Sequence, residues 1–280
     1  MKIVSFNVNS VRMRLHQLAQ VIDTHNPEFI GLQETKVQDH DFPLAAIEDL
    51  GYQAIYMGQK THYGVALLSR TTCLKPIYGF PTDTDDSQKR FIGGQFEVKG
   101  KAISVFNGYF PQGESRDHPT KFPAKAKFYR DLNDFVQSTD MAAIPPIETP
   151  LINSPTIIMG DYNISPQDID IGIGPDNAKR WLKTGKSSFL PEEREWYDKL
   201  CSLGLSDGFR LCYPIEDNVF SWFDYRSKGF DAEPKRGLRI DHLLVSDQLK
   251  SKVTNAGVDY AVRAMEKPSD HAPTWIELDF

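Results

Sequence analysis

Thr-Ile-Ile-Met-Gly-Asp-Tyr-Asn-Ile-Ser, residues 156–165, begins as an apolar run and continues into polar residues. Its β-branched apolar start is typical of a strand that is buried on both faces. Asp161 and Asn163 are two positions apart, so on extended backbone their side chains point to the same side, off the strand end. A carboxylate and an amide placed in this way could hold a hard cation, a water molecule or a phosphoryl oxygen. An ordinary Asx turn is the alternative interpretation, because Gly, Asp and Asn are common turn residues.

Two predicted strands near the N-terminus also end in polar residues. Residues 2–7 form an apolar strand that stops at Asn7, and apolar residues then recur at helical spacing over residues 11–25. A further strand over residues 28–32 is followed closely by Glu34. Both strands therefore present an oxygen ligand at their ends, as the first stretch does.

Strands predominate in the remainder of the chain, and helices separate them. The predicted strands cover residues 52–57, 64–69, 90–98, 101–109, 239–246 and 272–279. Helices are predicted over residues 43–50, around 128–136 and over 191–203, whereas residues 165–190 show no clear periodicity. The proline-rich residues 141–155 are expected to form a surface loop. We therefore expect two mixed β-sheets packed face to face with helices outside, in a single α/β domain spanning residues 1–280.

Composition excludes several classes of protein. The 280 residues are 40% hydrophobic and 25% charged, as in soluble globular proteins, and no apolar run approaches the length of a membrane span. The N-terminus turns polar too soon for a signal peptide, and the three cysteines lack metal-ligand spacing, so we expect a reducing, cytoplasmic location. A net charge of −6 argues against a non-specific nucleic-acid coating protein and says little about an enzyme.

Eight polar residues lie at the edges of predicted strands: Asn7, Glu34, Tyr109, Asp161, Asn163, Asp241, Asp270 and His271. Each has an ordinary explanation by itself, but strand ends on one rim of a sandwich meet at a common cleft. Oxygen ligands with amide support suit Mg²⁺ or Mn²⁺ better than zinc. Together these residues suit phosphate-ester cleavage, in which a cation neutralises charge, a carboxylate deprotonates water and a histidine donates to the phosphoryl oxygen. A buried carboxylate behind the histidine would fix its tautomer, and Asp241 is the candidate.

Eight short stretches, in order from the first residues to the last, carry a resemblance to a known family: IVSFNVNSVRMR (3–14), GLQETK (31–36), GYFPQG (108–113), GDYNISP (160–166), FLPEEREW (189–196), FSWFDYRSKGF (220–230), GLRIDH (237–242) and KPSDHAP (267–273). Through them the chain resembles the exonuclease III family of metal-dependent phosphodiesterases, within the endonuclease/exonuclease/phosphatase superfamily. The resemblance implies a four-layered α/β sandwich. Residues 141–155 and 231–235 look longer than the family usually has, which leaves only loop contacts in doubt.

The resemblance also implies roles for the polar residues. Asn7 and Glu34 would hold Mg²⁺, with Mn²⁺ as a substitute, and Asp270 would lie nearby. The full set of candidate metal ligands is Asn7, Glu34, Asp161, Asn163, Asp270 and His271. Asp161 would activate the water or protonate the leaving oxygen, and Asn163 and His271 would contact the scissile phosphate beside Tyr109. Asp241 would orient His271. Whether Asp161 or His271 acts as the base stays open.

Residues 220–240 indicate the substrate. In relatives of exonuclease III, residues matching Trp222, Leu238 and Ile240 line a pocket for an extruded abasic sugar. A nucleotide without its base loses little stacking when it flips out, so an apolar slot can select it. Cations that could meet flanking phosphates without reading sequence are Arg226, Lys228, Arg236 and Arg239, with Arg90, Arg116, Lys121 and Lys125 as weaker candidates.

The resemblance therefore predicts a DNA-repair nuclease that acts on double-stranded DNA, and we expect a monomer that does not act at a membrane. It would incise the phosphodiester 5′ to abasic sites and degrade duplex DNA from 3′ ends. A phosphoesterase acting on inositol phosphates or sphingomyelin is one alternative, but membrane-seeking loops and a secretion signal are not evident. A non-catalytic DNA-binding module is the other, and the intact Glu34, Asp161, Asn163 and His271 argue against it.

Overall fold

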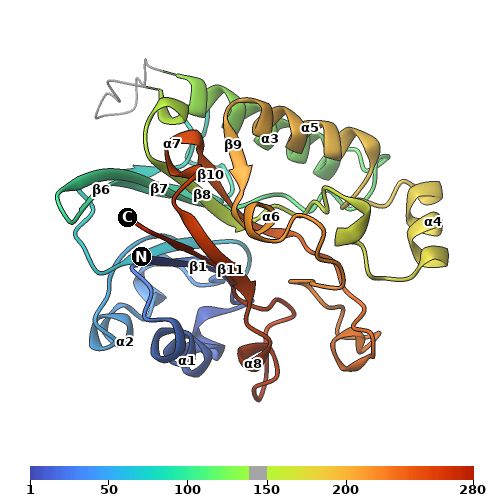
Figure 1. Ribbon diagram of the computed structural model, residues 1–280, viewed down its shortest axis with the longest axis horizontal. Coiled ribbons are helices and arrows are strands. Elements are labelled where there is room, and N and C mark those ends of the chain that lie inside the picture. The colour runs from blue at the N-terminus through green and yellow to red at the C-terminus, as the bar shows by residue number, and fades with distance from the viewer. Residues whose placement is uncertain (139–149) are drawn as a thin grey trace.

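Two six-stranded β-sheets lie face to face at the centre of the molecule, in a computed structural model that describes residues 1–138 and 150–280 (Figure 1). The strand order of the first sheet is β11 (Val253–Val258), β12 (Thr274–Leu278), β1 (Lys2–Asn7), β2 (Phe29–Gln33), β4 (Val65–Ser69) and β3 (Gln53–Met57). The order of the second is β5 (Lys75–Tyr78), β6 (Phe91–Val98), β7 (Lys101–Tyr109), β8 (Thr156–Asp161), β10 (Asp241–Ser246) and β9 (Leu205–Asp207).

Strand direction brings the polar strand ends to one rim of the sandwich. β1 and β2 are parallel in the first sheet, and β7 and β8 are parallel in the second. A hydrogen bond from Asn7 at the end of β1 to Asp161 at the end of β8 shows that the carboxyl ends of the two pairs meet. β10 and β12 run antiparallel to β8 and β1, so these strands begin at the same rim.

Alternating side chains fill an inner core and two outer ones. In β1, Ile3 packs between the sheets, whereas Val4 and Phe6 face the opposite way. The outer face of the first sheet is covered by α1 (Leu15–His25), α2 (Leu44–Asp49) and α8 (Tyr260–Arg263). The outer face of the second is covered by α3 (Lys121–Gln137) and α5 (Pro191–Ser202). These four layers, visible in Figure 1, confirm the predicted α/β sandwich.

Some elements differ from the prediction. The helix expected over residues 11–25 is interrupted at Arg14, where a 3₁₀ turn over Val11–Met13 gives way to α1. The helix α4 (Pro175–Thr184) was not predicted, although its apolar residues Ala178, Trp181 and Leu182 recur at helical spacing, because they are few among the polar residues of this stretch. The residue types at its two ends are typical of helix ends: Pro175 occupies the first turn, and Gly185, with a φ of 67°, follows the last turn.

The short strands β5, β9 and β11 and the short helices α6 (Gly208–Cys212) and α7 (Asp247–Lys250) were also not predicted. Three to six residues are too few for a periodicity to stand out. Most of the proline-rich segment 141–155 lies outside the described residues; its end, Leu151–Asn153, forms a 3₁₀ turn that leads into β8. None of the helices within the described residues is long and apolar enough to cross a membrane.

Candidate active site

A cavity of about 220 Å³ lies at the rim where the strand ends meet. It is lined by Glu34, Tyr109, Gln112, Asp161, Asn163, Trp181, Lys186, Ser188, Trp222, Leu238, Ile240, Asp270 and His271. Asn7 and Asp241 are buried next to it and hydrogen-bond to its walls. All eight polar residues at the edges of predicted strands are thus gathered at one place.

Asn7 joins the two sheets at the floor of this cavity. Its Nδ2 donates to Glu34 Oε1, which follows β2 of the same sheet, at 3.0 Å. The same nitrogen donates to Asp161 Oδ2, at the end of β8 in the other sheet, also at 3.0 Å. One buried amide therefore fixes the positions of two carboxylates relative to each other.

His271 lies between two other carboxylates. Its Nδ1 is 2.8 Å from Asp241 Oδ2, and its Nε2 is 3.8 Å from Asp161 Oδ2. All three side chains are at most 4% exposed. The contact with Asp241 makes Nδ1 a donor, so Nε2 is the nitrogen that faces Asp161 and the cavity.

Unusual backbone conformations place the ligands after the strands. Gly160 has a φ of 154°, and a Cβ there would lie 1.9 Å from the carbonyl oxygen of Gly108 on the neighbouring strand β7. Glu34 and Asn163 both adopt the left-handed region, with φ of 53° and 54°. Asp161 Oδ1 accepts the Asn163 backbone N–H at 3.0 Å, so the Asx turn foreseen as an alternative is present and forms part of the site.

Burial and neighbouring charges shift the pKa values of the central groups. Burial, together with the charges of Asp241 and Glu34, raises the pKa of Asp161 to about 7, although His271 opposes the shift. Burial disfavours the charged form of His271, but Asp241 and Asp161 outweigh it and raise the pKa of His271 to about 10. At neutral pH the site therefore holds a histidinium beside a carboxyl group that is close to its titration point.

The donor atoms at this rim fit a divalent metal ion. Donor atoms of Asp161, Asp241 and His271 lie within 4.8 Å of one another. Asp241 Oδ1 is buried and has no hydrogen-bond partner among the described residues. Glu34 is not in this group; it lies on the first-sheet side, bonded to Asn7 and 2.8 Å from Lys36 Nζ. Oxygen donors in an acidic, largely buried setting suit a hard cation.

The candidate metal ligand Asp270 is occupied by other contacts. Its Oδ1 accepts from Asn9 Nδ2 at 2.9 Å, and its Oδ2 accepts from Trp222 Nε1 at 3.1 Å. Burial raises the pKa of Asp270, but the charge of His271 and the bonds from these two donors lower it by more, so the net shift is downward. Asp270 thus anchors the indole of Trp222 at the mouth of the cavity.

Apolar side chains form another part of the cavity wall. Leu238 and Ile240 are buried there, and Trp222 forms β-bridges with both Leu238 and His271. Trp181 stacks on Phe189 with ring centroids 5.6 Å apart, and Lys186 lies 3.8 Å above the Trp181 ring. Apolar surface and titratable groups thus line the same cavity.

Sequence reasoning missed four residues of the cavity wall: Gln112, Trp181, Lys186 and Ser188. Trp181 and Lys186 carry the same signal as residues 220–240, an aromatic side chain among cations, in the stretch where no periodicity was found. Gln112 and Ser188 lie in loops and gave no comparable signal.

The cations predicted to contact phosphates differ in how exposed their side chains are. Arg226, Lys228, Arg236 and Lys121 are exposed, and Arg226 and Arg236 line a second cavity, of about 350 Å³, that shares Trp181 and Trp222 with the first. Arg90 is only 8% exposed, because its guanidinium is sandwiched between Tyr63 and Tyr109.

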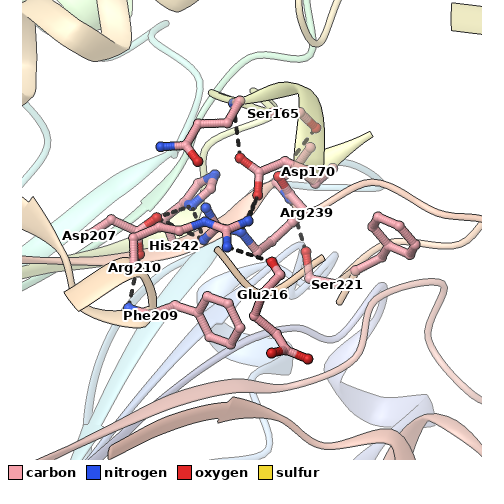
Figure 2. A network of polar contacts seen from close by, with 12 residues as sticks. Ser165, Asp170, Asp207, Phe209, Arg210, Glu216, Ser221, Arg239 and His242 are labelled. Atoms are coloured by element: carbon pink, nitrogen blue, oxygen red, sulfur yellow. Dashed lines mark hydrogen bonds and ion pairs between the residues drawn. The ribbon is translucent and has the colours of Figure 1, made fainter. Parts of the chain in front are cut away.

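Two of the predicted phosphate contacts are wrong. Arg239 is 2% exposed, and Figure 2 shows its side chain directed toward Asp170, Asp207 and His242, inside the protein. Lys125 is fully buried and paired with Glu193. Neither cation can reach DNA, since both are already paired with carboxylates in the interior.

Comparisons with known proteins agree with this geometry. A model of the endonuclease/exonuclease/phosphatase family matches residues 4–271. Exodeoxyribonuclease III of Haemophilus influenzae is 53% identical over 278 residues, covering 99% of this chain and 100% of the relative. A 3′ phosphatase from Neisseria, NExo, solved with a product DNA hairpin, superposes with a TM-score of 0.87 at 36% identity, with 100% of both chains covered. An AP endonuclease from Archaeoglobus fulgidus gives a TM-score of 0.86 at 31% identity, again over 100% of both chains.

Proposed function

The chain belongs to the endonuclease/exonuclease/phosphatase family, and we propose that it is a DNA-repair nuclease. The observation that carries this proposal is the placement of His271 between Asp241 and Asp161 at the cavity. A histidinium that can donate and a carboxyl group that can accept a proton then lie on one side of a phosphate-sized space. The relatives named above are nucleases or act on DNA ends, which supports DNA as the substrate.

Asp161 is our candidate for the general base. Because its pKa is about 7, a large fraction of Asp161 is ionised near neutral pH, and this ionised form can take a proton from a water molecule. His271, with a pKa of about 10, stays protonated and can donate through Nε2 to a phosphoryl oxygen. This assigns Asp241 the task of holding the ring and its charge, through the contact at 2.8 Å.

Two further side chains would orient the phosphate. Burial raises the pKa of Tyr109 well above 10, so its hydroxyl stays a neutral donor. Two hydrogen bonds fix Asn163: its Nδ2 donates to the carbonyl oxygen of Phe110, and its backbone N–H donates to Asp161 Oδ1. Because both residues are fixed before substrate arrives, little ordering remains for the reaction step.

We assign a divalent cation, Mg²⁺ with Mn²⁺ as a substitute, to the carboxylate of Glu34, which the Asn7 amide holds in place, with Asp270 nearby. His271 is a poor ligand, because its Nδ1 is bonded to Asp241 and its protonated Nε2 has no free lone pair. When bound, the cation would neutralise charge on the phosphate and the leaving oxygen.

For the substrate, we propose duplex DNA with an abasic site, cut 5′ to the lesion, and duplex 3′ ends removed stepwise. The small apolar wall of Trp222, Leu238 and Ile240 suits a sugar that carries no base. Arg226 and Arg236 lie beside the adjoining cavity, where they could meet phosphates without reading sequence. We expect the enzyme to act as a monomer.

The test is cleavage of a duplex oligonucleotide with one abasic analogue, in Mg²⁺ and in EDTA, by the wild type and Asp161→Asn. A metal-dependent nick at the lesion, lost in the variant, is expected. Activity on an inositol phosphate or sphingomyelin, without any on DNA, would contradict DNA as the substrate and favour a phosphoesterase of the other kind. Tight DNA binding without a nick in either metal would favour a non-catalytic module.

A further inference from the structure

A largely buried group of four charged side chains and one histidine lies behind the apolar wall of the cavity. This group, which we name the Arg239 network, consists of Asp170, Asp207, Arg210, Arg239 and His242 (Figure 2). Arg239 Nε donates to Asp170 Oδ1 at 2.7 Å, and Nη1 lies 2.8 Å from Asp207 Oδ2. Arg210 also donates to Asp170 Oδ1. None of these residues was needed for the chemistry proposed above.

The network joins segments that are far apart in the chain. Asp170 ends a 3₁₀ turn (Asp168–Asp170) in the loop after β8, Asp207 ends β9, and Arg239 and His242 flank Asp241 at the start of β10. His242 Nε2 donates to the carbonyl oxygen of Ile164 at 2.8 Å, and its Nδ1 accepts from Arg239 at 3.0 Å. The loop that follows Asp161 is thereby tied to the strand that carries Asp241.

Backbone contacts continue from this network to the cavity. Residues 170–172, 237–240, 221–222 and 271–272 lie side by side, and we name this arrangement the pocket ladder. The Arg239 N–H donates to the carbonyl oxygen of Asp170 at 3.0 Å, and Trp222 and Leu238 exchange two bonds, of 2.9 and 3.0 Å. The Ala272 N–H then donates to the carbonyl oxygen of Ser221 at 2.7 Å, next to His271.

Side chains alternate in direction along residues 238–240, and this alternation connects the Arg239 network to the wall of the cavity. Leu238 and Ile240 face the cavity, whereas Arg239, between them, points away from it into the network. Both the backbone N–H and the side chain of Arg239 bond to Asp170, so the segment can neither slide nor rotate without breaking a buried ion pair. A guanidinium fork held by two carboxylates fixes orientation in a way that an apolar side chain of equal volume does not.

We propose that Arg239, anchored by Asp170 and Asp207, is a positioning residue that sets the apolar wall of the pocket and so determines selectivity for a nucleotide without a base. This inference rests on the proposed function, because it takes the cavity to be the abasic-sugar pocket. A buried ion pair adds little stability compared with apolar packing, so a role in fixing geometry accounts for its presence. A wall displaced by a fraction of an ångström would admit a base-bearing nucleotide more readily.

The experiment compares two rates in the same enzyme sample: kcat/KM for incision at an abasic analogue, and kcat/KM for removal of an undamaged 3′-terminal nucleotide. The ratio of the two is unaffected by the fraction of enzyme that is folded, because that fraction multiplies both rates. We expect Arg239→Met to lower the ratio about tenfold or more, the range over which apolar pockets discriminate. Arg239→Lys keeps the positive charge but loses the forked guanidinium, so its ratio should lie between those of Arg239→Met and the wild type.

Two further variants keep the result interpretable. Ile47→Ala removes buried volume in α2, on the outer face of the first sheet, and should lower the melting temperature with the ratio unchanged. Asp170→Asn keeps the shape of the anchor without its charge and should lower the ratio in the same direction as Arg239→Met. Ratios within about twofold of the wild type in both Arg239 variants and in Asp170→Asn would overturn the inference. A wild-type ratio near one would instead contradict the proposed abasic substrate.

Discussion

Nδ1 of His271 lies 2.8 Å from Oδ2 of Asp241, across a gap of 30 residues in the chain. The contact requires a proton on Nδ1, and the negative charge of Asp241 keeps a second proton on Nε2. His271 is thereby a cation at the pH of most cells, and its free N–H faces the cavity. The pH dependence of the reaction follows from this buried pair and the carboxyl group of Asp161 beside it.

Asp241→Asn should lower activity and move the alkaline limb of the pH profile. Removing the charge of Asp241 lowers the pKa of His271 from about 10, so His271 loses its proton at a lower pH. We expect kcat to fall about 10²-fold or more, with the alkaline limb displaced toward neutrality. The profile of kcat against pH, at saturating DNA and fixed Mg²⁺, measures both effects. An alkaline limb at the same pH in the variant would contradict the assignment of His271 as the donor.

Asp161 should set the acid limb of the profile. Because burial raises its pKa to about 7, the carboxylate needed to accept a proton disappears below that pH. With one essential ionisation, kcat/KM should then fall about tenfold per pH unit. Asp161→Asn should abolish cleavage, whereas Asp168→Asn, an exposed carboxylate after the same strand, should leave the profile unchanged. A wild-type profile that is flat from pH 5 to 8 would exclude Asp161 as the base.

Binding of Mg²⁺ should raise the melting temperature through Glu34. A ligand that binds only the folded protein stabilises it by about 2.7 kcal/mol at 100 times its dissociation constant. The wild type should therefore melt several degrees higher in Mg²⁺ than in EDTA, without DNA present. Glu34→Gln should lose most of this increase, while Glu28→Gln, at the other end of β2, should keep it. An equal increase in Glu34→Gln and the wild type would place the cation elsewhere, with Asp161 and Asp241 as the next candidates.

Lys125 should be important for stability and not for DNA binding. Its Nζ donates to Glu193 and to the carbonyl oxygen of Asn163, and the side chains of Lys125 and Glu193 are fully buried. Lys125→Met leaves the charge of Glu193 unpaired, which should cost about 3–5 kcal/mol in the free energy of unfolding. Lys127→Met, which removes the exposed cation of the Lys127–Asp131 pair on the same helix, should cost less than about 1 kcal/mol.

Denaturation in urea measures both variants. The second substitution Glu193→Gln should recover most of the loss caused by Lys125→Met, since Gln can still accept from the backbone N–H groups of Ser188 and Leu190. A single Lys125→Met variant as stable as Lys127→Met would show that the buried pair contributes nothing.

The central part of the site was predictable because it depends on local pattern. An apolar run that ends in Asp161 and Asn163 can be read as a buried strand followed by ligands, and the same holds for Asn7 and Glu34. Parallel strands then have to present these ends at one rim. The sequence could not show that the amide of Asn7 would bridge both sheets, because that contact depends on how the two sheets are packed.

The burial of Arg239 and Lys125 depends on partners that lie far away in the chain. Alternation places Arg239 on the opposite side from Leu238 and Ile240, but only the fold shows that Asp170 and Asp207 cover that side. Lys125 lies three and seven residues before Phe128 and Leu132, so helical spacing already put it on the buried face of α3. Its partner, Glu193, belongs to another helix, and no local signal identifies it.

The most direct test of the account is to map the ends produced from two otherwise identical duplexes, one with a single abasic analogue and one undamaged. With Mg²⁺ present, we expect a single internal nick immediately 5′ to the analogue, leaving a 3′-hydroxyl, and no internal nick in the undamaged duplex. Asp161→Asn should give neither product. Internal cleavage at equal rates in both duplexes, or a nick on the 3′ side of the analogue, would contradict the account.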